Sequence, residues 1–224
     1  MSPELRKLLN DTVTVIVNIM EVRDPYTANH QRRVAQIGGT IAQEMGADLE
    51  FVEGIRVMGL LHDLGKIAIP SAILSKPGKL SQQVMDLVKM HPQVGHNILM
   101  QLKFPWPVAL AVVQHHERLD GSGYPFGLLG PDIILEARIL AVADVVEAMS
   151  SHRPYRPARS LEAAMEEISA HRGTLYDLQV ADACMGVLKP NNTHSYKPAL
   201  LRTDKKAGLP VPNLNKGDAP HEIE

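Results

Sequence analysis

An adjacent histidine and aspartate, His62-Asp63, end an apolar run and are followed by Gly65 and Lys66. Neighbouring imidazole and carboxylate groups can bind one metal ion, and the second carboxylate oxygen can bridge to another ion. Gly65 is expected to break the helix after this pair, which leaves Lys66 within reach of an anion held there. The segment 62–66 therefore predicts a metal site in which Asp63 can bridge two ions, with Lys66 within reach of whatever the pair holds.

Further imidazoles and one carboxylate fall at the inward face or the end of separate predicted helices. The candidate metal ligands are His30, His62, Asp63, His91, His115, His116 and Asp144. A single histidine on an apolar face is usually a core residue, but several helices that each deliver such a group indicate a shared site. A buried Asp144 is costly unless it is paired or binds a metal. The set lacks sulfur and exceeds the needs of one ion, so it predicts two divalent ions, with iron or manganese favoured and zinc as the alternative.

Apolar residues recur with helical spacing through most of the chain, which predicts an all-α fold of about seven to nine helices. The expected helices cover about 3–23, 27–45, 49–63, 81–91, 93–102, 105–116, 135–150, 160–171 and 177–189. Two stretches rich in Gly and Pro, 65–79 and 117–133, are expected to be loops. Long loops inside a compact domain are usually functional, so the second is a candidate substrate loop.

Composition narrows the class of protein. The 224 residues are 45% apolar and 21% charged, with a formal net charge of -2, which favours neither a nucleic acid polymer nor a membrane surface as partner. Cys184 is the only cysteine, so a disulfide framework is excluded. No run of about 18 apolar residues suggests a membrane span, and the charged N-terminus does not resemble a signal peptide, so a cytoplasmic protein is expected.

The chain divides into three predicted parts. Residues 1–24 form an N-terminal helix that packs on the catalytic domain or leads into it, and residues 25–189 form that domain. The proline-rich residues 190–224 have no sustained apolar period and are expected to be a disordered tail.

Several motifs together resemble the HD-GYP family, a branch of the HD superfamily of metal-dependent phosphohydrolases. They are Asp24-Pro25-Tyr26-Thr27 with His30, HDLGK at 62–66, His91-Pro92, HHERLDGSGYP at 115–125, Ala143-Asp144, and Arg153-Pro154-Tyr155-Arg156. The run HHERLDGSGYP is the most specific of these. The resemblance covers about residues 23–182 and implies the HD-superfamily helical bundle.

The resemblance also implies an activity. It is hydrolysis of cyclic di-GMP to pGpG, and in some members on to GMP, by a metal-bridging hydroxide in bacterial second-messenger signalling. One metal would take His30, His62, Asp63 and Asp144, and the other would take Asp63, His91, His115 and His116. The implied catalytic residues are Asp63 and Lys66, and no organic cofactor is implied.

The substrate contacts are assigned in the same way. They are Lys66, Asp120, Gly121, Gly123, Tyr124, Pro125, Arg153 and Arg156. Glu117 follows the histidine pair and either orients one imidazole or forms a salt bridge within the loop. Some family members have a Glu four residues before the first histidine, which recruits a third metal. Here that position is Tyr26, so two metals are expected.

Three other functions stay open at this level. The same machinery can hydrolyse 3′,3′-cyclic GMP-AMP, or the chain can be a cyclic di-GMP sensing or docking module with little turnover. A plain HD-type nucleotidase ranks last, because His91, the histidine pair and the Gly-Tyr-Pro loop exceed its simpler ligand set. Expected partners include diguanylate cyclase domains or an upstream sensor or receiver domain. The amphipathic first helix suits core packing and a homodimer contact equally well.

Overall fold

The computed structural model describes residues 2–74, 76, 78, 80–151 and 160–189, and of residues 25–28 the backbone alone. The predicted tail 190–224 and the predicted contacts Arg153 and Arg156 lie outside this part. The described chain is helical and contains no strand beyond two isolated bridges, so the all-α prediction is confirmed. The elements are α1 (Pro3–Arg23), α2 (Pro25–Glu44), α3 (Leu49–Leu61), η1 (Leu64–Ala68), α4 (Ser71–Leu74), α5 (Gln82–Val88), α6 (His91–Leu99), α7 (Val108–Gln114), η2 (Gly130–Asp132), α8 (Leu135–Ser150), α9 (Leu161–Ala170) and α10 (Leu178–Leu188).

Local sequence explains several helix boundaries. Ser2 caps α1 by accepting a hydrogen bond from the Leu5 amide at 3.3 Å, and Pro3 follows at the first helical position. Asp48 caps α3 through the Phe51 amide at 2.8 Å. Pro92 lies in the first turn of α6, where its missing N–H costs nothing, so this helix begins at His91 and not after the proline.

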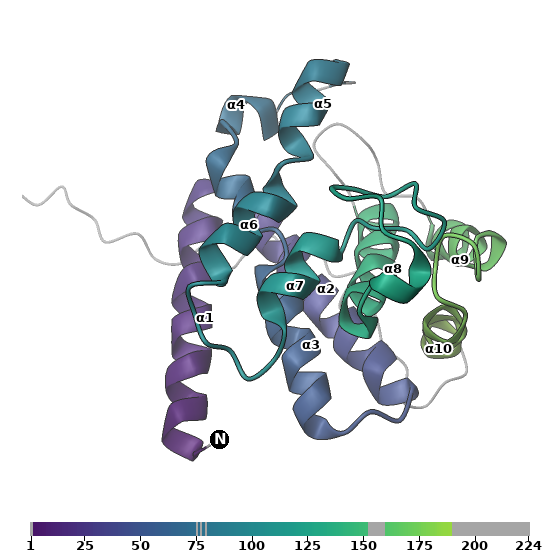
Figure 1. Ribbon diagram of the computed structural model, residues 1–224, viewed down its shortest axis with the longest axis horizontal. Helices are drawn as coiled ribbons and strands as arrows, with labels where there is room; N and C mark the ends of the chain where they lie inside the picture. Colours follow the sequence, from purple (N-terminus) through teal and green to yellow (C-terminus); the bar gives the residue numbers. More distant parts are fainter. Residues whose placement is uncertain (1, 75, 77, 79, 152–159, 190–224) are drawn as a thin grey trace, which may run out of the picture.

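Helices α2 and α3 form the centre of the fold, and α8 and α10 also pack against α2 (Figure 1). Gly59 allows the close approach of α3 to α2, since a Cβ there would lie 2.5 Å from the Ala35 Cα. The fully buried side chains of this core include Ile37, Ile41 and Ile55. Helix α1 lies at the edge of the molecule, beside α2 and α3.

Two features differ from the sequence-based expectation. Helix α3 ends at Leu61, so His62 and Asp63 lie in the turn between α3 and η1. The stretch 65–79, predicted as loop, contains most of η1 and the single-turn α4. The pair His62-Asp63 is therefore presented by a turn whose shape depends on η1.

Candidate metal centre

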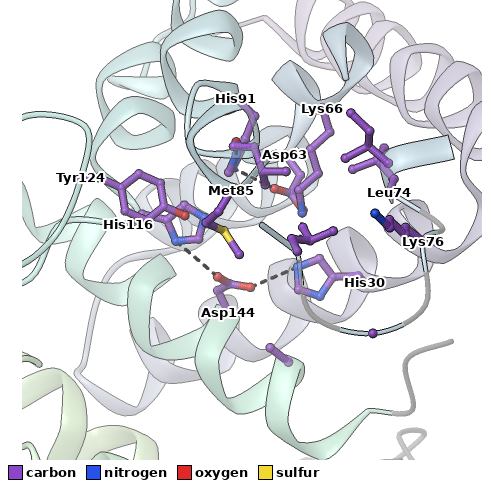
Figure 2. A pocket seen from close by; sticks show the side chains of 15 residues that line it. His30, Asp63, Lys66, Leu74, Lys76, Met85, His91, His116, Tyr124 and Asp144 are labelled. Carbon is purple, nitrogen blue, oxygen red and sulfur yellow. Dashed lines mark hydrogen bonds and ion pairs between the residues drawn. The ribbon is translucent and has the colours of Figure 1, made fainter. Parts of the chain in front are cut away.

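The seven predicted ligands come from five parts of the chain and meet at one place; Figure 2 draws five of the seven. His30 lies on α2, His62 and Asp63 follow α3, His91 opens α6, His115 and His116 follow α7, and Asp144 lies on α8. Their potential ligand atoms form three overlapping groups, in each of which all atoms lie within 4.8 Å of one another. The groups are His30, His62 and Asp144; His62, Asp63 and His115; and His91, His115 and His116.

Three imidazoles are oriented in the same way. The Nδ1 atom of His62 lies 2.7 Å from the carbonyl oxygen of Gly59. In the same way, Nδ1 of His91 lies 2.8 Å from the Val88 oxygen, and Nδ1 of His115 lies 2.6 Å from the Val112 oxygen. A carbonyl only accepts, so Nδ1 carries the proton and Nε2 is left with a lone pair. Each of these Nε2 atoms is buried and makes no hydrogen bond within the described chain. A metal ion would satisfy all three, so the residues present fit a metal centre.

The Asp63 carboxylate lies among these imidazoles. Its Oδ1 is 3.2 Å from the His91 Nε2, and its Oδ2 is 3.4 Å from the His62 Nε2. The Lys66 ammonium donates a hydrogen bond to Oδ2 at 2.6 Å. The two oxygens face different histidines, which is the arrangement that a bridging carboxylate requires.

Electrostatics hold four of the predicted ligands in the protonation state that a metal requires. Burial lowers the pKa of His62, and burial together with the neighbouring imidazoles holds the pKa values of His115 and His116 well below their usual range. Burial alone would raise the pKa of Asp63, but Lys66 and His62 hold it well below its usual value. His62, His115 and His116 are therefore neutral and Asp63 is ionised near neutral pH, the states in which these groups bind a metal.

His30 is held differently, by a carboxylate that the sequence analysis missed. Its Nδ1 is hydrogen-bonded to the Glu147 Oε2, and its Nε2 lies 3.1 Å from the Asp144 Oδ1. Burial acts to lower the pKa of His30, but these two carboxylates raise it to about 9. Glu147 is fully buried and its Oε1 also accepts from Arg33 at 2.5 Å and from Ser151 at 2.6 Å. The sequence signal for this role of Glu147 is its position, one helical turn after Asp144 on the same face of α8.

Glu117 accepts hydrogen bonds from backbone amides of the loop that follows it. Its buried carboxylate accepts hydrogen bonds from the amides of Phe126 at 2.7 Å and Leu128 at 2.9 Å. These bonds close the segment between the histidine pair and η2, so Glu117 stabilises the loop; within the described residues, no hydrogen bond or ion pair joins its carboxylate to an imidazole or a cationic side chain.

The metal centre opens into a cavity of about 790 Å³ (Figure 2). Five predicted ligands line it, namely His30, Asp63, His91, His116 and Asp144. The other lining residues are Lys66, Ile73, Leu74, Lys76, Gly78, Leu80, Met85, Val88, Tyr124 and Ala148. The apolar wall from α4 and α5 was not expected from the sequence, because its residues were interpreted as core or loop.

The predicted substrate residues divide into two groups. Lys66 and Tyr124 line the cavity, and the Tyr124 ring stacks on His116 with the centroids 4.6 Å apart and the planes at 28°. Lys89 places its ammonium 5.2 Å from the centre of the same ring. Tyr124 therefore connects the metal centre to the open part of the cavity.

The remaining described residues of that set shape the loop and are not among the residues that line the cavity: Asp120, Gly121, Gly123 and Pro125. Asp120 accepts hydrogen bonds from the amide and hydroxyl of Ser122 at 2.9 and 2.7 Å. Gly121 has a φ of +80°, and a Cβ on Gly123 would lie 2.4 Å from the Glu117 Cα. These positions bring Tyr124 to its place without facing the cavity themselves.

Comparisons with known proteins agree with this geometry. A family model described as "HD domain" matches residues 14–180. The cyclic di-GMP phosphodiesterase response regulator RpfG of Xanthomonas campestris pv. campestris is 42% identical over 184 residues, which are 81% of this chain and 49% of that protein. A cyclic di-GMP phosphodiesterase of Thermotoga maritima is 39% identical over 188 residues, which are 83% of this chain and 51% of that protein. The chain thus spans about half the length of these two relatives.

A third relative, the 3′3′-cGAMP-specific phosphodiesterase 1 of Vibrio cholerae, is 37% identical over 172 residues, which are 75% of this chain and 39% of that protein. Among solved structures, Bd1817, described as an HDG"Y"P protein from Bdellovibrio bacteriovorus, has a TM-score of 0.59 at 22% identity, covering 71% of this chain and 51% of that one. This likeness concerns the fold alone. No helix in the described part of the chain is long and apolar enough to cross a membrane.

Proposed function

The chain belongs to the HD-GYP family of HD-domain phosphohydrolases, and from this premise we propose that it hydrolyses cyclic di-GMP to linear pGpG. One observation carries the proposal: three buried Nε2 atoms without hydrogen bonds surround Asp63, beside a cavity that a small anionic ligand can enter. Relatives named as cyclic di-GMP phosphodiesterases support the choice of substrate.

In this proposal two divalent ions share the centre, with iron or manganese favoured over zinc. One ion would be held by His30, His62, Asp63 and Asp144, and the other by Asp63, His91, His115 and His116. Bound there, the ions would supply a water of lowered pKa and positive charge at the phosphorus. Tyr26, in place of a carboxylate four residues before His30, supports a count of two.

The chain's own residues supply the remaining steps. Asp63 holds both halves of the centre together, and Glu147 fixes the ring of His30 through Nδ1 so that Nε2 faces Asp144. Lys66 lines the cavity, where its ammonium would neutralise charge that grows on the phosphoryl oxygens. Tyr124 lines the cavity beside the apolar wall that includes Met85 and Val88, where its ring would contact one base. The volume of about 790 Å³ lies within the usual range for small-molecule sites.

A second substrate is favoured by a specific observation. Three relatives named as 3′3′-cGAMP-specific phosphodiesterases are 35% to 37% identical to this chain. Guanine and adenine differ at their edges, so the choice between the two substrates depends on polar groups around the base and not on the metals.

We further propose that residues 25–189 form the catalytic domain, since the ligands run from His30 to Asp144. A cytoplasmic location, and control by a sensor or receiver domain or by diguanylate cyclase domains, are parts of the same proposal.

The test is turnover of cyclic di-GMP and of 3′,3′-cyclic GMP-AMP by protein loaded separately with iron, manganese or zinc, with the products separated chromatographically. The expected result is faster turnover of cyclic di-GMP, with pGpG as the main product. Faster turnover of cyclic GMP-AMP would identify that compound, and not cyclic di-GMP, as the preferred substrate. Tight binding of cyclic di-GMP by metal-loaded protein without turnover would identify a sensing module and overturn the enzymatic proposal.

A further inference from the structure

Lys76 lines the cavity beside the metal centre, and none of the roles proposed above uses it. It follows the single-turn α4, and its side chain is exposed. In Figure 2 its ammonium points into the cavity, toward the side on which Lys66 and His30 lie. Lys66 and Lys76 are the two lysines among the described lining residues, and none of these residues is an arginine. A second ammonium group therefore faces the space that a ligand of the metal centre must occupy.

The two lysines differ in their partners. The Lys66 ammonium donates a hydrogen bond to the Asp63 carboxylate at 2.6 Å. The Lys76 ammonium has no ion pair or hydrogen bond with any described residue. Two ammonium groups that face one space repel each other, and an anion that enters this space would remove the repulsion. The cavity is thus suited to a ligand that carries negative charge near Lys76 as well as at the metal centre.

A series of backbone hydrogen bonds places Lys76 at the rim of the cavity. It begins at the buried Ile69, whose carbonyl accepts a hydrogen bond from the Arg23 guanidinium at 2.9 Å. The Pro70 carbonyl then accepts from the Ile73 amide at 2.9 Å, and the Ile73 carbonyl accepts from the Lys76 amide at 3.3 Å. The backbone at Lys76 is therefore connected to the core, while its long side chain can adjust to a ligand.

The proposed substrate requires a cation at a second place. A cyclic dinucleotide contains two phosphodiester groups, each with one negative charge, and cleavage of one of them gives the linear product. In the proposed function the cleaved phosphate lies at the metal centre. The other phosphate belongs to the same small ring and enters the cavity with it. A charge that leaves water without a partner is costly, so the second phosphate needs a cation of its own.

We propose that Lys76 binds the phosphate of the cyclic dinucleotide that is not cleaved; this inference rests on the proposed function and deepens it. Lys66 serves the phosphate at the metal centre, and Lys76 serves the second one. Cyclic di-GMP and 3′,3′-cyclic GMP-AMP both have this second phosphate, so Lys76 contributes to the affinity for either and does not distinguish them. The product pGpG keeps the same internal phosphodiester and is also held by Lys76. GMP has a single phosphate and is not.

The variant Lys76→Met tests the proposal in manganese-loaded protein. KM for cyclic di-GMP should rise by about tenfold or more, the effect of losing one charge-assisted hydrogen bond, while kcat changes by less than about twofold. The inhibition constant of pGpG should rise by a similar factor, whereas that of GMP should not change. Lys76→Arg keeps a cation and should retain most of the affinity. Lys103→Met is the matched control, since this exposed lysine does not line the cavity and should leave all these constants unchanged.

The outcomes separate this inference from the proposed function. If the wild-type chain hydrolyses cyclic di-GMP and Lys76→Met has an unchanged KM, the inference is wrong and the proposed function stands. Equal weakening of pGpG and GMP would place Lys76 at the phosphate of the metal centre and would also overturn the inference. If the wild-type chain binds cyclic di-GMP without turnover, the enzymatic proposal fails, but the dissociation constant should still rise about tenfold in Lys76→Met. A wild-type chain that binds neither cyclic dinucleotide would overturn both.

Discussion

The two halves of the cavity are built in different ways. In the metal half, the imidazoles lie on or directly after helices, and three of them are fixed by the backbone carbonyl group three residues earlier in the chain. The facing half comes from α4, α5 and the loop around Tyr124, and neither α4 nor α5 has a buried residue. If the first half binds metals and the second binds substrate, as proposed, substitutions in the second half are expected to change substrate preference without loss of metal.

Two buried carboxylates mark the boundary between the halves. Glu147 supports the metal half, where it bonds His30 and Arg33. Glu117 supports the substrate half, where it bonds two loop amides. If the halves are separable, removing the charge of each carboxylate must give a different defect.

The largest effect is expected from Asp63→Asn, which keeps the shape of the side chain but removes the bridging charge. Turnover should fall by more than about 10³-fold, beyond the loss caused by one oxyanion donor, because both parts of the centre lose a ligand. Steady-state kinetics measures the loss of turnover, and elemental analysis measures the loss of bound metal. Asp86→Asn, at an exposed position on α5, is the control and should leave both unchanged. Normal turnover in Asp63→Asn would refute the assignment.

Glu147→Gln should weaken metal binding by about 10- to 100-fold, the usual effect of removing a carboxylate that orients a metal-binding imidazole. The neutral amide holds the His30 ring less firmly and makes its Nε2 less basic. Titration with manganese measures the affinity. An unchanged affinity would show that Glu147 only pairs with Arg33 and has no part in the metal half.

Glu117→Gln should have the opposite profile. Metal content should stay at the wild-type value, while KM rises by about tenfold, because the loop that carries Tyr124 loses charge-assisted hydrogen bonds that contribute about 1.5 to 3 kcal/mol each. Kinetics and metal analysis on the same sample measure both quantities. Loss of metal with little change in KM would erase the distinction between the two carboxylates.

The smallest effect is expected at Tyr124. Tyr124→Ala should raise KM by about 3- to 10-fold, since a stacked aromatic contact contributes about 0.5 to 1.5 kcal/mol. Tyr124→Phe keeps the ring over His116 and should change KM by less than about twofold. Equal defects in the two variants would assign the role to the hydroxyl and not to the stacking.

The sequence predicted the metal half more fully than the substrate half. Histidines at the inward face or end of amphipathic helices, with the pair His62-Asp63, are local signals, so the seven candidate ligands could be named. Glu147 could not be assigned, because its partner His30 lies 117 residues away and an isolated glutamate in a helix is ordinarily a surface residue. The wall from Ile73 to Val88 was missed because apolar residues that line a cavity have the same spacing as those that fill a core.

Metal content tests the central claim most directly. The wild-type chain, loaded with manganese and freed of loosely bound ions, should contain two ions per chain by elemental analysis, and His91→Ala should contain fewer. Two ions are expected because the carboxylate that would recruit a third is replaced by Tyr26, while Asp63 has an oxygen for each of the others. A content near three, or of one or none, would contradict the account.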